Sequence, residues 1–296
     1  MNRDAITVLV DGIFSKALQV RRMLQRGETE MTRLPLAEIT SLAHRLEPNL
    51  SPDDIEQATA SFSKQRWHLP SVELSVQDGY AKWAEVYDDG GNPLIAVEEP
   101  AMLGLLGDVA GKDVLDAACG TGRYAVRLAQ AGARVCGVDA SEEMLAAAKR
   151  KQSEAGVNVD FRLGDLTRLP CADASFDLAV CALALCHVAD LSSVFAELAR
   201  VLRPGGRLIV SDFHPFCLQV GWRTVFTTPE ASYFIENQYH LTQDYLDALL
   251  ANGFVLRGLR EEVIDDRLLS VWSQEEVERF RGLPAALLIS AQRKEQ

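Results

Sequence analysis

The stretch Val114-Leu115-Asp116-Ala117-Ala118-Cys119-Gly120-Thr121-Gly122 decides the fold of this chain. Apolar residues are followed by an acidic residue and small side chains, and the stretch leads into the amphipathic segment 123–131. This order predicts a buried strand, a tight turn and the start of a helix. Small side chains let a ligand approach the backbone, and free N–H groups at a helix N-terminus favour electron-rich groups. We therefore expect a ligand site at this turn.

From Gly111 onward, patterns typical of strands and helices alternate along the chain. Predicted strands cover 113–117, 134–139, 157–163, 178–183, 207–212, 254–259 and 285–292. Between them lie predicted helices, such as the one that Ser141 caps, the apolar stripe 191–202 and the segment 242–250. The run 178–183 is continuously apolar, as expected of a central parallel strand covered on both faces. The alternation predicts an α/β fold with a doubly wound sheet and a ligand at the strands' carboxyl ends.

The first 75 residues have a different character and are predicted to be all-helical. Apolar residues between Ile6 and Leu18 recur at the spacing of an amphipathic helix, and Ser51-Pro52-Asp53-Asp54 has the form of a helix start. We therefore expect two domains, a helical N-terminal cap over 1–75 and an α/β domain over 76–296. The apolar stripe must be covered, either by the α/β domain or by a second subunit of a homodimer.

Composition narrows the classes of partner. The chain has 296 residues and is 48% hydrophobic. Its net charge of −12 argues against a surface that binds nucleic acid, although this does not exclude a local basic patch. Its six cysteines show no C-x-x-C pair and no metal-ligand spacing, so we expect reduced thiols and no metal. The longest uncharged apolar run, 178–189, is too short to span a bilayer, and Asp4 and Asp11 interrupt any signal peptide. These features predict a cytoplasmic protein without a membrane partner.

Three acidic residues stand at the ends of consecutive predicted strands. Asp139 is placed to accept hydrogen bonds from two ribose hydroxyls, and Asp165, beside Leu166, to hold an exocyclic adenine amine. Asp116 lies beneath the turn, where a cationic amine is favoured. Each of them alone is more often a cap or a turn residue, but three in series at one edge favour a ligand site.

Several motifs in order resemble those of class I S-adenosylmethionine-dependent methyltransferases, and in particular the ubiquinone/menaquinone-biosynthesis branch. They are Asp116-x-x-x-Gly120-x-Gly122, Gly137-Val138-Asp139-Ala140-Ser141 with Met144, Gly164-Asp165-Leu166, Phe176-Asp177-Leu178 and Leu202-Arg203-Pro204-Gly205-Gly206. The resemblance covers about residues 78–292 and departs from the common pattern at Ala118, where many members have glycine. It implies a seven-stranded Rossmann-like sheet in the order 3-2-1-4-5-7-6 with the seventh strand antiparallel, and S-adenosyl-L-methionine as cofactor.

The resemblance also implies a set of cofactor residues. The methionine part would be lined by Asp116, Ala118, Cys119, Gly120 and Gly122, and the ribose and one adenine face by Asp139, Ala140 and Met144. Asp165 and Leu166 would hold the rest of the adenine, while Cys181 and Ala182 would lie beneath the sulfonium. Tyr80-x-x-Trp83-x-x-x-Tyr87 resembles the lid that precedes the first strand, with Tyr80 and Tyr87 over the cofactor, although aromatic packing of a cap helix explains it equally well.

Methyl transfer needs alignment, exclusion of water and, where the acceptor carries a proton, a general base. The candidate bases near the strand ends are His187, His214 and His240. We place His187 first, because it follows the strand expected to face the methyl group, and His214 second. Nothing in the sequence identifies the acceptor atom, so we expect a small-molecule acceptor methylated on carbon, oxygen or nitrogen.

Two other functions stay open. Gly120-x-Gly122-x-x-Ala125 with Asp139 also fits a nicotinamide-dependent oxidoreductase, although that function leaves Asp116, Gly164-Asp165 and the Pro204-Gly205-Gly206 motif unexplained. A non-catalytic partner protein would bind the cofactor poorly and use its N-terminal helices in an assembly. Absorbance of a bound cofactor near the nicotinamide band would identify the first alternative, and calorimetric titration with S-adenosylmethionine and S-adenosylhomocysteine would separate the second from the enzyme.

Overall fold

The structure, a computed structural model, describes residues 71–89, 91–219 and 221–295. The chain divides into two compact units, one made of Glu73–Pro215 and Ile235–Gln296, the other of Phe216–Phe234 together with the chain up to Val72. The predicted helical cap over residues 1–75 lies almost wholly outside the described residues and stays a prediction.

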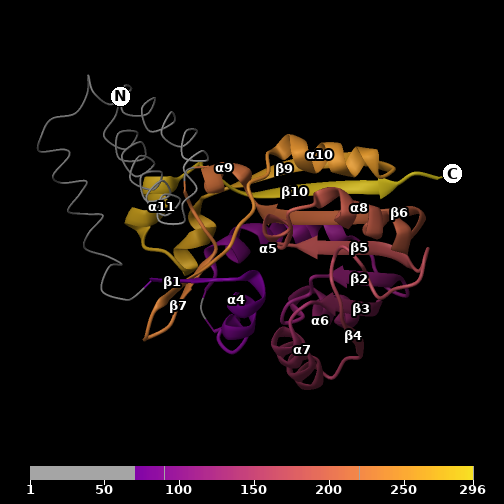
Figure 1. Ribbon diagram of the computed structural model, residues 1–296, viewed down its shortest axis with the longest axis horizontal. Coiled ribbons are helices and arrows are strands. Elements are labelled where there is room, and N and C mark those ends of the chain that lie inside the picture. The colour runs from indigo at the N-terminus through magenta and orange to yellow at the C-terminus, as the bar shows by residue number, and fades with distance from the viewer. Residues whose placement is uncertain (1–70, 90, 220, 296) are drawn as a thin grey trace, which may run out of the picture. The chain divides into compact units, whose positions relative to one another are not determined.

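The larger unit is built on a seven-stranded sheet in the order β4-β3-β2-β5-β6-β10-β9 (Figure 1). Its strands are β2 (Asp113–Ala117), β3 (Arg134–Asp139), β4 (Val159–Leu163), β5 (Phe176–Ala182), β6 (Leu202–Phe213), β9 (Phe254–Val263) and β10 (Pro284–Arg293). Neighbouring strands from β4 to β6 are parallel, and β10 is antiparallel to both β6 and β9. Numbered within this sheet, the order is 3-2-1-4-5-7-6, so the predicted α/β topology is confirmed.

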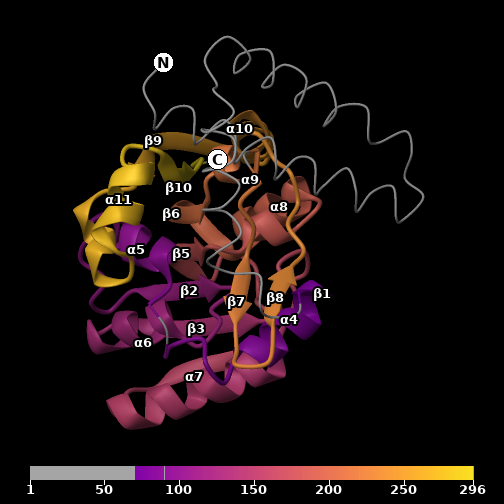
Figure 2. The ribbon, with the colours of Figure 1, turned by 90° about the vertical axis from the view of Figure 1, so that its left-hand side faces the viewer.

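Helices cover both faces of this sheet, as the two views show (Figures 1 and 2). On one face, α5 (Pro93–Leu106) and α6 (Arg123–Gln130) pack with Val114 and Val180 into one apolar core. On the other, α8 (Leu191–Val201) and α10 (Thr242–Ala251) pack with Leu115 and Cys181 into a second core. Successive residues of β2 and β5 thus alternate between the two cores, as the period of a strand requires. The helix α7 (Glu142–Ala155) contacts α6, β3 and β4.

The remaining elements are shorter. They are β1 (Ser71–Leu74), α4 (Val76–Trp83), η1 (Leu185–His187), α9 (Pro215–Gln219), β7 (Val225–Thr227), β8 (Ser232–Ile235), η2 (Asp266–Ser270) and α11 (Gln274–Phe280). Strands β7 and β8 pair antiparallel, and the rings of Phe226 and Tyr233 stack with their centroids 5.0 Å apart. A second sheet, in the order β1-β8-β7, was not expected from the sequence, because these three strands are too short to show a period.

One boundary differs from the prediction in an informative way. The fifth strand was expected over 207–212, but β6 begins at Leu202, directly after α8. Its pairing with β5 jumps from Phe176↔Leu202 to Leu178↔Arg207, so the residues between form a bulge. Arg203 leaves this bulge to donate to Asp177 Oδ1 at 2.6 Å and to Asp113 Oδ2 at 2.9 Å. The motif predicted to end the helix therefore also ties β6 to β5 and, one strand further, to β2.

No helix within the described ranges is long and apolar enough to cross a membrane. All six cysteines are free and buried.

Candidate cofactor site

The turn between β2 and α6 has an unusual backbone. Ala118, Gly120 and Gly122 all have positive φ, at 58°, 53° and 77°. At Gly122 a Cβ would also lie 3.1 Å from both Ala148 Cβ and Phe161 Cζ, so glycine is required there twice over. At Gly120 nothing lies within 4 Å of the position that a Cβ would take, so that side of the turn has room for a ligand. The strained backbone at Ala118 is a feature of functional sites.

Asp139, at the end of β3, is held by the same turn. Gly120 N donates to its Oδ2 at 2.7 Å, and Ser141 N donates to its Oδ1 at 2.9 Å. Burial raises the pKa of Asp139, while backbone hydrogen bonds from Ser141, Gly120 and Ala140 lower it. A carboxylate offers about four acceptor positions, so capacity remains for a ribose hydroxyl. The residues present therefore fit the predicted cofactor at this position.

Asp116, at the end of β2, lies beneath the turn as expected. It is 1% exposed, and its Oδ2 accepts a hydrogen bond from Ala125 N at 2.8 Å. Burial is the largest cause that raises its pKa to about 7. The carboxylate thus ties β2 to the first turn of α6. Its negative charge is disfavoured by burial, so a cationic amine would be a suitable partner for it.

The predicted adenine residues follow β3 and β4 in the chain, and Met144 lies in the first turn of α7. Met144 and Leu166 are buried, whereas Ala140 is exposed. Asp165 is exposed, and its Oδ1 accepts hydrogen bonds from Thr167 N at 2.7 Å and from Thr167 Oγ1. The Asp165 side chain therefore serves a local turn, and its other oxygen is the one left to face an adenine amine.

The two small residues predicted beneath the sulfonium end β5. Cys181 is fully buried and Ala182 is half-buried. Leu183 follows in a left-handed conformation with φ of 56° and donates its N–H to Ser211 O at 2.8 Å. Leu183 therefore still bonds to β6, and its left-handed backbone marks the end of the regular strand.

The aromatic residues of the predicted lid lie in and just after α4. The rings of Tyr80 and Trp83 stack with centroids 5.8 Å apart, and those of Trp83 and Tyr87 meet edge-on at 4.9 Å. Burial raises the pKa of Tyr87 to about 12 and that of Tyr80 well above its ordinary value, so both phenols are neutral. The aromatic packing is thus present, and the covering of a cofactor stays a prediction.

His187 ends η1 and contacts the lid directly. Its Nε2 lies 2.9 Å from Tyr80 Oη, and its Nδ1 lies 2.6 Å from the backbone oxygen of Glu236. A carbonyl only accepts hydrogen bonds, so Nδ1 carries the proton and Nε2 accepts one from the tyrosine. Burial lowers the pKa of His187, which favours this neutral imidazole. A basic nitrogen is therefore aimed at the lid.

The other two candidate histidines point elsewhere. His214 Nε2 lies 3.1 Å from Glu261 Oε1 on β9, and its backbone N–H donates to Ala285 O. His240 Nε2 donates to Val188 O at 2.7 Å. The structure therefore joins His187 to the lid, directs His214 toward β9, and uses His240 to hold the segment after η1.

Sequence reasoning missed a buried carboxylate, Glu98 on α5. It is fully buried, and it accepts hydrogen bonds from Tyr124 Oη at 2.8 and 2.9 Å and from Ser211 Oγ at 2.5 Å. Arg123 lies 3.3 Å away and also pairs with Glu99 at 3.1 Å. A useful signal was present, because Glu98 and Glu99 are the acidic pair within an otherwise apolar helix.

A second missed group links the lid segment to the glycine turn. Thr121 Oγ1 donates to Asp88 Oδ1 at 3.0 Å. Lys151 Nζ on α7 donates to Thr121 Oγ1 at 3.0 Å and pairs with Asp88 Oδ2 at 2.8 Å. The residue that follows Tyr87 is therefore fastened to the turn that the cofactor is expected to occupy.

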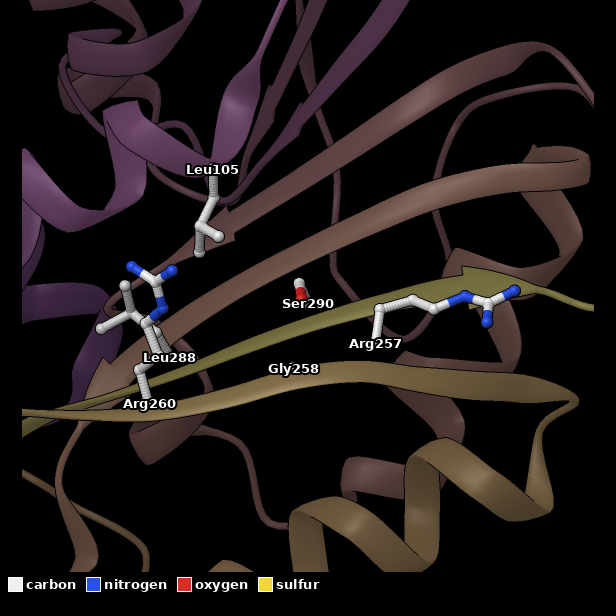
Figure 3. A pocket seen from close by; sticks show the side chains of 6 residues that line it. All are labelled: Leu105, Arg257, Gly258, Arg260, Leu288 and Ser290. Atoms are coloured by element: carbon white, nitrogen blue, oxygen red, sulfur yellow. The ribbon is translucent and has the colours of Figure 1, made fainter.

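A pocket of about 150 Å³ lies between the end of α5 and the strands β9 and β10 (Figure 3). Its lining residues are Leu105, Arg257, Gly258, Arg260, Leu288 and Ser290. It shares no residue with the predicted cofactor set, and Arg257 already donates to Gln292 Oε1 at 2.7 Å. This pocket is thus separate from the strand-end site.

Comparison with known proteins relates this part of the chain to methyltransferases. Residues 115–210 match the protein family described as a methyltransferase domain. The ubiquinone/menaquinone biosynthesis C-methyltransferase UbiE of Bdellovibrio bacteriovorus is 35% identical over 153 residues, which are 49% of this chain and 64% of that protein. The demethylmenaquinone methyltransferase of Beutenbergia cavernae is 38% identical over 50% of this chain and 61% of its own length. The match thus spans less than two thirds of each relative.

A solved structure extends the similarity to more of the chain. The S-adenosylmethionine-dependent methyltransferase from Mesorhizobium loti is 26% identical with a TM-score of 0.55, over 69% of this chain and 99% of that one. Its coverage exceeds the matched family segment and includes most of the α/β unit. Together with the strand order, these comparisons show that the α/β sheet contains a segment that matches a methyltransferase domain and is similar in fold to S-adenosylmethionine-dependent methyltransferases.

Proposed function

We propose that this chain transfers a methyl group from S-adenosylmethionine to a small-molecule acceptor, at carbon, oxygen or nitrogen. The observation that carries the proposal is Asp139, held by Gly120 N and Ser141 N at the carboxyl end of β3, beside the glycine turn. In the bound state the cofactor supplies an electrophilic methyl group on a sulfonium. The residues of the chain bind and orient it, exclude water and accept a proton.

Binding would use the ends of four consecutive strands. Asp139 would accept hydrogen bonds from the ribose, and Met144 and Leu166 offer buried apolar surface to the adenine. Asp116 would act through its buried charge beneath the turn, where the methionine amine is expected. The left-handed residues of the turn keep its backbone close to the cofactor without side-chain obstruction.

Proton removal, where the acceptor requires it, would pass through Tyr80 and His187. His187 Nε2 is the basic nitrogen, and Tyr80 Oη occupies its acceptor position at 2.9 Å. An acceptor hydroxyl that displaces this phenol would meet the nitrogen directly, and one that bonds to the phenol would reach it through the tyrosine. Both routes use the neutral imidazole whose tautomer Glu236 O fixes. His214 is the second candidate, and its contact with Glu261 makes it the weaker one.

The acceptor class follows from charge and from the relatives. The net charge of −12 disfavours a polyanionic nucleic acid. The two relatives are named for ubiquinone or menaquinone biosynthesis, so quinols and phenols are the first acceptors to test. A methyl-transfer assay should follow radiolabelled methyl from the cofactor into small phenols and quinols, with tRNA and bulk protein as the competing classes. Labelling of the macromolecules without any small molecule would overturn this proposal.

The base assignment has its own test. His187→Gln should lower kcat about 100-fold or more for an acceptor that loses a proton, with cofactor affinity changed less than about threefold. The matched control is His214→Gln, which should keep most of the activity. Near-native turnover of His187→Gln would show that alkylation needs no base at this residue.

The N-terminal segment completes the proposal. Residues 1–75 would shape the acceptor pocket and contribute to a homodimer, because the apolar stripe from Ile6 to Leu18 needs a partner surface. Light scattering of the full chain tests the dimer. Substitution of two stripe residues, Ile13→Asp with Leu9→Asp, should yield a monomer with weaker acceptor binding, whereas an unchanged dimer with unchanged KM would contradict both roles.

No observation favours the nicotinamide-dependent alternative. A glycine turn and Asp139 are common to both, but a dinucleotide site leaves the buried Asp116 beneath the turn unexplained. Tight binding of a nicotinamide dinucleotide, without binding of S-adenosylmethionine, would reverse this preference. Binding without any turnover on the acceptor panel would favour the non-catalytic alternative.

A further inference from the structure

Asp212 lies one residue before the end of β6, at the edge of the sheet where the cofactor is expected. The preceding residue, Ser211, pairs with Ala182 of β5. Side chains alternate along a strand, so Ser211 reaches Glu98 on α5 while Asp212 reaches Tyr245 on α10. Asp212 therefore shares its face of the sheet with the neighbouring core of α8 and α10, which also contains Cys181.

This carboxylate is buried and fully engaged by neutral groups. Asp212 and Tyr245 are each 1% exposed, and Tyr245 Oη donates to Asp212 Oδ2 at 2.6 Å. Phe213 N donates to the other oxygen, Oδ1, at 2.9 Å, and the thiol of Cys186 adds a further hydrogen bond. Three donors thus hold one carboxylate in a fixed position at the base of the segment that carries His187.

No lysine or arginine of the described residues pairs with Asp212. The group closest to a counter-charge is the imidazole of His240, which bears on Asp212 electrostatically and lies edge-on to Tyr245 at 5.6 Å. His240 Nε2 is already committed to Val188 O. A buried carboxylate without a cation is costly, so its charge is a candidate for a functional role.

The chemistry of the proposed reaction supplies a use for that charge. The methyl donor carries a positive sulfonium, and the product left behind is a neutral thioether. A negative charge buried near the donor attracts the first and is indifferent to the second, and a medium of low dielectric constant strengthens the attraction. Asp212 needs no contact with the ligand to act in this way.

We propose that Asp212 is a specificity-determining residue that favours binding of the charged methyl donor over its neutral product. This inference rests on the proposed function. It assigns to the Asp212 carboxylate the task of favouring release of the neutral product after transfer. Asp116 and Asp139 carry charge of the same sign at neighbouring strand ends, so Asp212 would add to their field from the far side of Cys181.

The test compares the affinities of S-adenosylmethionine and S-adenosylhomocysteine by calorimetry at pH 8 and low salt. Asp212→Asn should weaken binding of the first about tenfold and change binding of the second less than about twofold. Asn keeps an acceptor for Tyr245 Oη, so the variant should fold, and Asp212→Ser provides a second neutral variant with a smaller side chain. Tyr245→Phe keeps the carboxylate and should keep the ratio of the two affinities within about twofold.

A matched control removes the same charge from elsewhere. Asp108→Asn lies on the exposed segment before β2, at the opposite edge of the sheet, and should leave both affinities unchanged. Equal weakening of the two ligands in Asp212→Asn, or weakening of neither, would overturn the inference while leaving the proposed function intact. If the unaltered chain bound neither ligand, the proposed function would fail, and this inference with it.

Discussion

Two buried carboxylates, Glu98 and Asp212, lie at the same edge of the seven-stranded sheet but on opposite faces. Glu98 reaches Ser211 from α5, and Asp212 is the very next residue of β6. Glu98 has a tyrosine, a serine and the guanidinium of Arg123 around it, whereas Asp212 has only neutral donors. The guanidinium of Arg123 neutralises the charge of Glu98, so Glu98 holds its neighbours together. The charge of Asp212 has no such partner and acts on its surroundings. Burial alone therefore does not distinguish a structural carboxylate from a functional one.

The largest expected effect comes from Glu98. Glu98→Ala would leave Tyr124 Oη, Ser211 Oγ and part of Arg123 buried without their acceptor, so the free energy of unfolding should fall by about 3–5 kcal/mol. Urea denaturation measures it. The control is Glu99→Ala, whose partly exposed side chain should cost less than about 1 kcal/mol. Similar losses in the two variants would remove the distinction between a structural network and a surface pair.

Asp139 extends the comparison to a carboxylate that is held by backbone donors and also expected to bind ligand. Asp139→Ala should cost about 1.5–3 kcal/mol in affinity for S-adenosylmethionine, because two ribose hydroxyls lose a charged acceptor. Calorimetry on a variant with native circular dichroism checks it. Unchanged affinity would mean that the carboxylate serves only the turn between β2 and α6.

Asp212 gives a pH-dependent difference in stability. Burial raises its folded pKa to about 6 from an ordinary value of 3.8, so the folded state binds the proton more readily than the unfolded one. Stability of the unaltered chain therefore falls as pH rises through this interval and stays lower above about pH 6. Asp212→Asn lacks this loss, so its free energy of unfolding relative to the unaltered chain should rise by about 1–3 kcal/mol from pH 4 to pH 7.

Urea denaturation of Asp212→Asn and of the unaltered chain, at the same pH values between 4 and 7, measures that difference. The comparison between variant and unaltered chain cancels the other titrating groups, including Asp116. A difference that is flat across the interval would show that the Asp212 charge is compensated, and the contrast with Glu98 would then disappear.

The smallest effect is expected at the link between the lid and the turn. Lys151→Gln removes the ion pair with Asp88, whose two side chains are partly exposed, and a hydrogen bond to Thr121, so the loss of stability should stay below about 1 kcal/mol. Salt at about 1 M should abolish most of that loss, because exposed pairs are screened. A larger loss of stability that does not depend on salt would show that this link behaves like the buried network around Glu98.

Much of the architecture could be predicted because its signals are local. The apolar runs of β2 and β5, the period of α8 and the cap at Ser141 depend on residues close in the chain. The predicted start of β6 was wrong. The strand pairs with β5 on both sides of a bulge that contains the Pro204-Gly205-Gly206 motif, and this motif was predicted to lie outside the strand. Short strands such as β7 and β8 carry too few residues to show a pattern.

The sequence by itself determined the order of strands and helices, the glycine turn and the acidic residues at the strand ends, because spacing along the chain encodes each of them. Only the tertiary structure brought Tyr80 within 2.9 Å of His187 across 107 residues of chain, fixed the imidazole tautomer through Glu236 O, and set Glu98 against Ser211. The reason is physical: a periodic pattern reports which side of its own element a side chain faces. The partner that it meets there depends on how separate elements pack.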